Sequence, residues 1–203
     1  MQLCDGQGNE CDAVISSVTP TEVTFDTSAW RKAETEPTVS VTLFQCLPKA
    51  GKMEIIIQKC VELGACGFVP VQSDRCVVVL KPPYEGRIER WQRVSEEAAK
   101  QSRRGIIPRV YDPVALDKLS FADFDTVLVA YENERTVSLK TALRRGCGMR
   151  AAIVVGPEGG FSEQEIALLE EKGAVSVSLG TRILRTETAG MTMTAQILYE
   201  VEP

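Results

Sequence analysis

Apolar and polar residues alternate along this chain with two periods, one typical of strands and one typical of helices. Short, nearly continuous apolar runs predict buried strands at 39–46, 68–71, 76–80, 126–131, 151–155 and 175–179. Apolar residues three or four positions apart predict helices at 52–63, 88–103, 136–145 and 187–201, with a further helix that begins at 162. Because strands and helices alternate, the pattern predicts an α/β fold whose parallel sheet is covered on both faces.

Several of these helices have a recognisable inner face or end. The inner face of the segment 52–63 is expected to be Met53, Ile56, Ile57, Cys60 and Val61. That of the segment 88–103 is expected to be Ile88, Trp91, Ser95, Ala98 and Ala99. Gly64 should end the first helix, and Ser162 with Glu165 forms a capping box that should begin the helix after 161.

The first thirty residues follow a different pattern. Short β-like runs at 13–18 and 22–25 lie between turn signals at Asp5-Gly6-Gln7-Gly8 and Thr19-Pro20. Residues 31–38 are polar and reach a proline, so they are interpreted as a linker. So few residues cannot bury a core of their own, and the segment is expected to be a fragment or an appendage of the larger part.

The composition fits a globular chain and excludes several kinds of chemistry. The 203 residues are 44% hydrophobic, which suffices for a real core, and no apolar run is long enough to span a membrane. The start, Met1–Asp5, lacks the basic and apolar parts of a signal peptide, so a cytoplasmic location is expected. Histidine is absent, which leaves carboxylates, Lys, Tyr, Cys or water for proton transfer. Seven cysteines without a CxxC spacing favour small buried side chains over disulfides or a metal site.

The charge is unevenly distributed along the chain. The net charge is −5, yet residues 81–110 hold eight basic and four acidic side chains. A local basic face can contact phosphates whatever the global sum, although a solvated helix of mixed charge explains the same residues.

Three expected strand exits have unusual sequences: Tyr131-Glu132-Asn133-Glu134, Gly156-Pro157-Glu158-Gly159-Gly160 and Leu179-Gly180-Thr181-Arg182-Ile183-Leu184-Arg185. Ligands of open parallel sheets bind at the carboxyl ends of strands, and glycines there let the backbone approach a ligand. Neither a GxGxxG dinucleotide motif nor a P-loop is present. Glu158 would repel a phosphate, so a cofactor with little or no phosphate fits better, and S-adenosylmethionine is one. Alternatively, the glycines only form tight turns.

The two glycine segments, Val155–Ser162 and Leu179–Ala189, resemble the signature loops of the RsmE-type SPOUT family, the bacterial 16S ribosomal RNA (uracil-N3)-methyltransferases. The resemblance runs in order over 39–203 through the segments Leu47-Pro48-Lys49, Gln58-Lys59, Glu62-Leu63-Gly64, Pro70, Asp74-Arg75-Cys76-Val77, Glu97-Ala98-Ala99-Lys100-Gln101-Ser102, Arg104 and Pro108. It implies a SPOUT-type parallel sheet with a C-terminal trefoil knot, a bent S-adenosylmethionine in the knot loops and a homodimer with an active site between subunits.

Residues 5–10 resemble only the middle of the PUA-like β-barrel with which this family normally begins. The resemblance therefore implies a partial PUA-like β module at 1–36, truncated or abbreviated, and a knotted methyltransferase domain at 37–203. An incomplete barrel would affect RNA docking more than cofactor binding.

The implied reaction, part of rRNA processing, is methyl transfer to N3 of a specific uridine in 16S ribosomal RNA of the small subunit. Arg185 is expected to stabilise the uracil anion, or else to pair with Glu158 or Glu187. Glu187 could accept the proton, or it could be a carboxylate that is favoured in the first turn of its helix by the helix dipole alone. The expected cofactor-binding residues are Tyr131, Glu132, Gly156, Pro157, Glu158, Gly159, Gly160, Leu179, Gly180, Ile183, Leu184, Arg185 and Thr188. The expected RNA contacts are Lys49, Lys59, Arg75, Arg103 and Arg104, with Lys52 among the scattered cations.

Two other functions fit the same pattern. One is an RNA-binding ribosome assembly factor of this fold without methyl-transfer activity, which the glycine loops disfavour. The other is a small-molecule α/β transferase that uses the acidic strand exits.

The last expected helix carries Met191, Met193, Ala195, Ile197, Leu198 and Tyr199, which predicts either a homodimer interface or a helix buried in the core.

Overall fold

A parallel sheet forms the centre of the chain in the computed structural model, which describes residues 1–49 and 51–202. Its order is β11-β9-β10-β5-β6-β7, and β8 also pairs with β6. The strands are β5 (Ser40–Cys46), β6 (Gly67–Gln72), β7 (Arg109–Val110), β8 (Val114–Ala115), β9 (Thr126–Ala130), β10 (Arg150–Val155) and β11 (Val175–Val177). Their pairings are all parallel, which confirms the prediction from the apolar runs. Their carboxyl ends therefore meet at one edge of the sheet.

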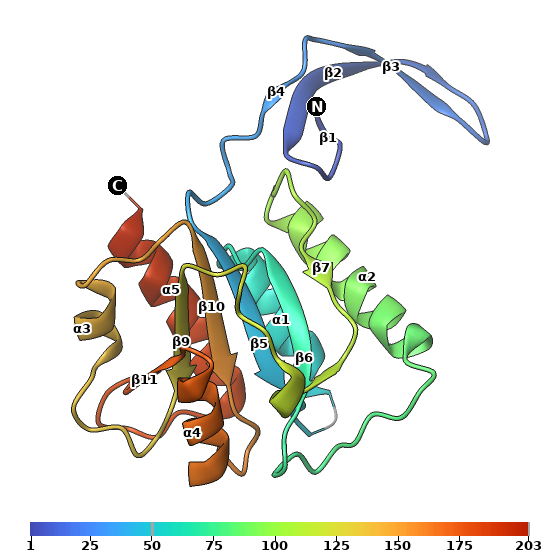
Figure 1. Cartoon of the computed structure of the whole chain (residues 1–203). Helices are drawn as coiled ribbons and strands as arrows, with labels where there is room; N and C mark the ends of the chain where they lie inside the picture. The colour runs from blue at the N-terminus through green and yellow to red at the C-terminus, as the bar shows by residue number, and fades with distance from the viewer. Residues whose placement is uncertain (50, 203) are drawn as a thin grey trace.

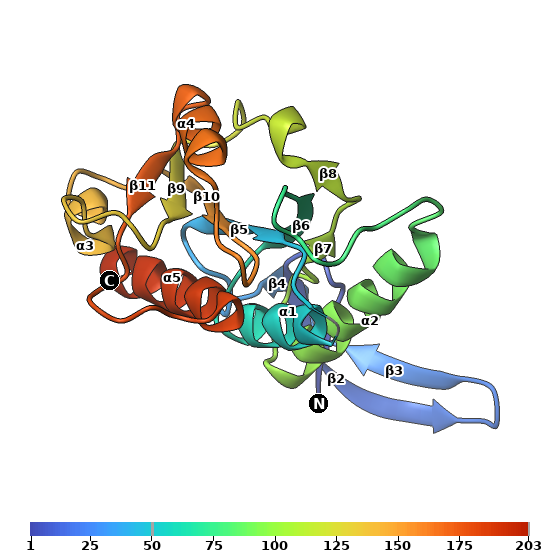
Figure 2. The ribbon, with the colours of Figure 1, turned by 90° about the horizontal axis from the view of Figure 1, so that it is seen from below.

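Helices cover both faces of this sheet. They are α1 (Lys52–Glu62), α2 (Glu85–Gln101), α3 (Leu139–Leu143), α4 (Glu163–Glu171) and α5 (Thr186–Val201), with the 3₁₀ helix η1 (Leu116–Lys118). Helices α1, α2 and α5 lie on one face, and α4 with η1 lies on the other (Figure 2). None of the helices in the described ranges is both long enough and apolar enough to cross a membrane.

The expected inner faces are buried where the sequence pattern put them. All five inward residues predicted for α1 are buried, as are Trp91, Ser95, Ala98 and Ala99 of α2, while Ile88 is only partly buried. The capping box is present: the Ser162 hydroxyl accepts from the Glu165 N–H, and the Glu165 carboxylate accepts from the Ser162 N–H. Gly64 follows α1 with a φ of 102°, as a helix stop requires.

Two sequence predictions about elements were wrong. Residues 76–80 form no strand, and Val77 and Val79 are 72% and 61% exposed. β-Branched residues favour a strand only where a partner strand is available, and the place beside β6 is taken by β7 and β8, which the sequence did not reveal. Helix α3 begins later than expected because the Glu134 carboxylate binds the backbone N–H groups of Thr136 and Val137.

The N-terminal segment forms a small antiparallel sheet of β1 (Gln2–Cys4), β2 (Asn9–Val18), β3 (Val23–Thr27) and β4 (Arg31–Lys32). The hairpin of β2 and β3 projects away from the rest of the chain (Figures 1 and 2). The base of the sheet is held to the segment after α2 by backbone hydrogen bonds from Gly8 N to Gly105 O (2.9 Å) and from Ile107 N to Gly6 O (3.1 Å). A Cβ at Gly105 would overlap the Cβ of Ala33, so only glycine allows the two backbones to pass this closely.

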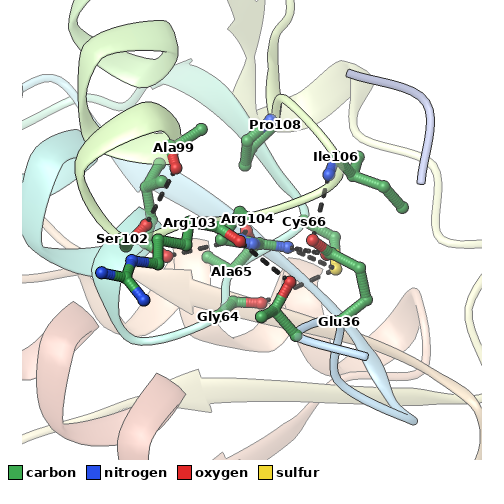
Figure 3. A network of polar contacts seen from close by, with 12 residues as sticks. Glu36, Gly64, Ala65, Cys66, Ala99, Ser102, Arg103, Arg104, Ile106 and Pro108 are labelled. Atoms are coloured by element: carbon green, nitrogen blue, oxygen red, sulfur yellow. Dashed lines mark hydrogen bonds and ion pairs between the residues drawn. The ribbon is translucent and has the colours of Figure 1, made fainter. Parts of the chain in front are cut away.

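A buried ion pair fixes the segment that joins the small sheet to β5. Arg104 Nη2 lies 2.6 Å from Glu36 Oε2, and the two side chains are 3% and 14% exposed. Arg104 also donates to the backbone carbonyls of Val61 and Ala65, and the other Glu36 oxygen accepts from Ile106 N at 3.0 Å (Figure 3). The segment 31–38, expected to be a linker, is thus anchored at Glu36.

We expect Arg104→Met to lower the free energy of unfolding by roughly 3 kcal/mol, because Glu36 would remain buried without its partner. The matched control is Lys100→Met in the last turn of α2, four residues before Arg104, whose pair with Glu97 is exposed and contributes less than about 1 kcal/mol. Urea unfolding of both variants measures the difference. Equal losses would show that burial does not decide the strength of the Arg104 pair.

Candidate active site

A pocket of about 460 Å³ lies at the carboxyl edge of the sheet. It is enclosed by the three strand exits that the sequence singled out, after β9, β10 and β11, together with the starts of α1 and α5. Its lining residues are Lys52, Ala130, Tyr131, Glu132, Arg135, Val155, Gly156, Pro157, Glu158, Gly160, Phe161, Ser178, Leu179, Gly180, Thr181, Arg182, Ile183, Leu184, Arg185, Thr186 and Ala189. Ligand pockets of this size commonly hold a small molecule or cofactor.

The loop after β10 passes closely under the loop after β9. Gly160 has a φ of 65° and donates from its backbone N–H to Pro157 O at 3.0 Å. A Cβ at Gly160 would meet the carboxylate of Glu132, which belongs to the loop after β9. A side chain at position 160 would therefore both strain the turn and push these two walls of the pocket apart.

The loop after β11 supplies the opposite wall and is open toward solvent. Gly180 has a φ of 115°, and a Cβ there would meet no atom within 4 Å. Leu179 and Leu184 are partly buried against the core, whereas Ile183 is 84% exposed. This wall therefore combines a bare backbone with apolar side chains, which suits a flat aromatic ring.

A buried polar chain holds these two walls together. The side chain of Gln45, at the end of β5 and fully buried, donates to Thr186 Oγ1 at 2.8 Å. Thr186 Oγ1 in turn donates to Gly156 O at 2.6 Å. Buried polar groups are costly unless they are paired, so this chain fixes the start of α5 against the loop after β10. Gln45 was not predicted as a site residue, although an amide inside an otherwise apolar strand run is a visible signal.

Lys52, which lines the pocket, bridges two carboxylates, and only one of them, that of Glu158, also lines the pocket. Its Nζ lies 2.9 Å from Glu158 Oε1 and 3.1 Å from Glu187 Oε2. The hydrogen bonds to Glu158 and then to Glu187 raise the pKa of Lys52. For both carboxylates burial opposes ionisation, but hydrogen bonds from the backbone and from Lys52 outweigh it and lower the pKa of each. All three groups are therefore charged at neutral pH.

Most of the expected cofactor-binding residues line the pocket. Those that do are Tyr131, Glu132, Gly156, Pro157, Glu158, Gly160, Leu179, Gly180, Ile183, Leu184 and Arg185. Two do not: Gly159 accepts from Arg75 Nη1 at 3.0 Å, and Thr188 is exposed on α5. Thr181 and Arg182 also line the pocket and belong to the loop 179–184 that the sequence singled out. The lining residues that were not predicted are Lys52, Ala130, Arg135, Val155, Phe161, Ser178, Thr186 and Ala189.

The two residues expected to act in catalysis differ in their surroundings. Arg185 lines the pocket, is exposed and makes no capping hydrogen bond through its side chain. Within residues 1–49 and 51–202 it forms no ion pair, so the alternative pairing with Glu158 or Glu187 is not seen. Glu187 does not line the pocket, and its lowered pKa makes it a weaker base than an ordinary glutamate.

The residues expected to contact RNA fall into three groups. Lys49 and Arg75 are exposed beside the glycine loop, where Lys49 N donates to the Glu158 carboxylate at 3.2 Å. Lys59, which pairs with Glu62 at 2.9 Å, and Arg103 lie at the far ends of α1 and α2. The prediction for Arg104 was wrong, because its guanidinium is buried against Glu36 and cannot reach a phosphate.

Comparison with known proteins assigns a class to this arrangement. A family model described as an RNA methyltransferase domain matches residues 34–198. The ribosomal RNA small subunit methyltransferase E of Bacillus subtilis is 38% identical over 207 residues, which cover 98% of this chain and 81% of that protein. The protein of the same name from Synechocystis is 38% identical over 168 residues, 81% of this chain and 54% of that protein. The chain therefore belongs to the ribosomal RNA small subunit methyltransferase E family.

Solved structures agree with this assignment. A ribosomal RNA small subunit methyltransferase E from Neisseria gonorrhoeae bound to S-adenosyl methionine is 31% identical, with a TM-score of 0.86 over 97% of this chain and 81% of that chain. A putative methyltransferase from Legionella pneumophila in complex with the cofactor SAM is 29% identical, with a TM-score of 0.83 over the same shares. In the described part of this chain no three His, Cys, Asp or Glu side chains cluster as metal ligands.

We expect Gly160→Val to weaken binding of S-adenosylmethionine by more than about tenfold, because the new side chain strains the turn and displaces Glu132. The control is Gly86→Ala in α2, where an added Cβ meets nothing within 4 Å. Isothermal titration calorimetry measures the affinities, and circular dichroism checks that both variants fold. Unchanged affinity in Gly160→Val would remove this loop from the binding site.

Proposed function

We propose that this chain transfers a methyl group from S-adenosylmethionine to N3 of a specific uridine in 16S ribosomal RNA of the small subunit. The observation that carries the proposal is the pocket built from both glycine loops at the carboxyl edge of the sheet. Membership of the ribosomal RNA small subunit methyltransferase E family supports the reaction class. The uracil position follows only from the resemblance in the sequence.

The residues of the pocket suit S-adenosylmethionine better than a phosphorylated cofactor. Glu132 and Glu158 lie in its walls and would repel phosphate groups. The bare backbone around Gly180 leaves room for a ring against the apolar side chains of Leu179 and Leu184. Tyr131, Glu132 and the loops 156–160 and 179–184 would hold the cofactor.

The chemistry needs a nitrogen anion and a route for its proton. When bound, S-adenosylmethionine supplies an electrophilic methyl group. Uracil N3 carries a proton whose pKa lies well above neutral, so the guanidinium of Arg185, permanently charged, would stabilise the anion. Glu187 remains a candidate proton acceptor through water, although its ion pair with Lys52 makes it a weak one.

We further infer a trefoil knot and two domains, 1–36 and 37–203, with the first a partial PUA-like module. The knot is supported by the path of the chain, which runs from β11 at the outer edge back to α5 against β10 and β5. The hydrogen bond between Thr186 and Gly156 O holds this path against the loop after β10. The module is supported by the separate antiparallel sheet at the N-terminus.

A homodimer is supported by one face of α5. Met193, Ile197 and Leu198 are buried within the chain, so part of the apolar character of the helix belongs to the core. Met191 and Ala195 are only partly buried and Tyr199 is 87% exposed. These three residues are four positions apart and share one face of the helix, which is what a helix presents to a partner.

The proposed RNA surface is smaller than the sequence indicated. Lys49 and Arg75 both contact the loop after β10, at Glu158 and Gly159, and could position a phosphate beside the target base. Lys59 lies in the last turn of α1 and Arg103 just after α2, and these residues would contact more distant nucleotides. Arg104 is left out because it is buried.

We expect the chain to methylate small ribosomal subunits, and Arg185→Ala to lower kcat about a hundredfold, because the uracil anion loses its stabilising cation. The affinity for S-adenosylmethionine should change much less. Arg144→Ala is the control, since Arg144 is exposed at the C-cap of α3, outside the pocket. Transfer of labelled methyl groups measures turnover, and mass mapping of nucleosides locates the product. Cofactor binding without transfer would favour an assembly factor, and turnover on a free nucleoside would favour a small-molecule transferase.

We expect the chain to be a dimer at micromolar concentration and Ala195→Glu to be a monomer, because the charge would lie in the α5 face. Gln164→Glu, which adds the same charge to the exposed side of α4, should leave the dimer intact. Light scattering after size exclusion measures the mass of each. A monomeric parent chain would contradict the proposed interface.

A further inference from the structure

The ion pairs of Lys52 join three segments that are far apart in the sequence. Lys52 is the first residue of α1, Glu158 belongs to the loop after β10, and Glu187 lies in the first turn of α5. The three side chains are 27%, 24% and 20% exposed. The cluster is therefore partly shielded from solvent, where ion pairs are stronger than on an open surface.

The position of Lys52 is not explained by the stability of α1. The positive end of a helix dipole lies at the N-terminus, so a cation in the first turn is unfavourable there. Its N-cap residue is Gly51, which makes no side-chain capping hydrogen bond. What compensates the unfavourable position is the pair of carboxylates, both contributed by pocket-forming segments.

Arg185 is a second cation close to Glu187. It precedes Glu187 by two residues, and its charge contributes to the lowered pKa of that carboxyl. Without Lys52, Glu158 and Glu187 would have no ion-pair partner among the described residues, and the exposed guanidinium of Arg185 readily forms bidentate pairs with carboxylates. Arg185 would then turn toward them and away from the pocket.

We propose that Lys52 is a positioning residue that occupies Glu158 and Glu187 and thereby leaves the guanidinium of Arg185 free to face the substrate. This inference rests on the proposed function, in which Arg185 acts on the base. Lys52 itself need not touch substrate: it acts by removing the competing partners of Arg185. The local charge of the cluster is then −1 rather than −2, which also limits repulsion of the uracil anion.

The test compares Lys52→Met, Lys52→Arg and the double variant Lys52→Met with Glu158→Gln, which restores the local charge of −1. In Lys52→Met we expect kcat to fall by roughly tenfold or more while the affinity for S-adenosylmethionine changes by less than about threefold. Lys52→Arg and the double variant should each recover part of the loss. Lys140→Met, an exposed lysine of α3, is the matched control.

A crystal structure of Lys52→Met gives a readout that does not depend on activity. It should show the Arg185 guanidinium paired with Glu158 or Glu187. The inference is overturned if Arg185 keeps its position there, if Lys52→Met turns over like the parent chain, or if the double variant is no better than Lys52→Met. Absence of methyl transfer in the parent chain would instead count against the proposed function, and the position of Arg185 would still decide the role of Lys52.

Discussion

Parallel pairing of β9, β10 and β11 is the constraint from which the site follows. Because hydrogen bonding aligns these strands in one direction, their carboxyl ends lie at the same edge, and the loops that leave them must converge. The loops alone would not keep a fixed distance from one another. The buried contact from Gln45 through Thr186 to Gly156 O fixes the start of α5 against the loop after β10, and the bridge from Lys52 to Glu158 and Glu187 adds a charged link between the same two segments.

The two links differ in the way they respond to their surroundings. The link through Gln45 is neutral and fully buried, so neither salt nor moderate pH weakens it. The Lys52 bridge is charged and partly exposed, and it depends on two carboxylates whose pKa is lowered in the folded chain. Its stabilising effect is therefore complete at pH values above the pKa of an ordinary carboxyl group, and it is lost only as the pH falls through the lowered pKa values of Glu158 and Glu187. Acid therefore releases only the Lys52 bridge, and the link through Gln45 still holds the start of α5 against the loop after β10.

The sequence predicted the sheet, the main helices and the three converging loops, because apolar periodicity and glycine placement are local signals. It did not predict what depends on distant partners. Val77 and Val79 have strand propensity, but the place next to β6 was already occupied. Arg104 looked like a phosphate contact, yet Glu36, 68 residues away in sequence, buries it. In the sequence Lys52 is one of several scattered cations, and its ion pairs with Glu158 and Glu187 depend on segments that only the fold brings together.

The ion pair between Arg104 and Glu36 anchors the segment that joins the small N-terminal sheet to β5, so the sheet is not attached through a flexible linker. Its base is hydrogen-bonded to the segment after α2, and the connecting segment is anchored by a buried pair. A flexible arm would search many orientations and lose entropy when it bound. Because the base of the sheet is anchored, the fold sets the distance between the pocket and the projecting β2–β3 hairpin (Figure 1). The choice of one base in the RNA could then depend on this distance as well as on the chemistry of the pocket.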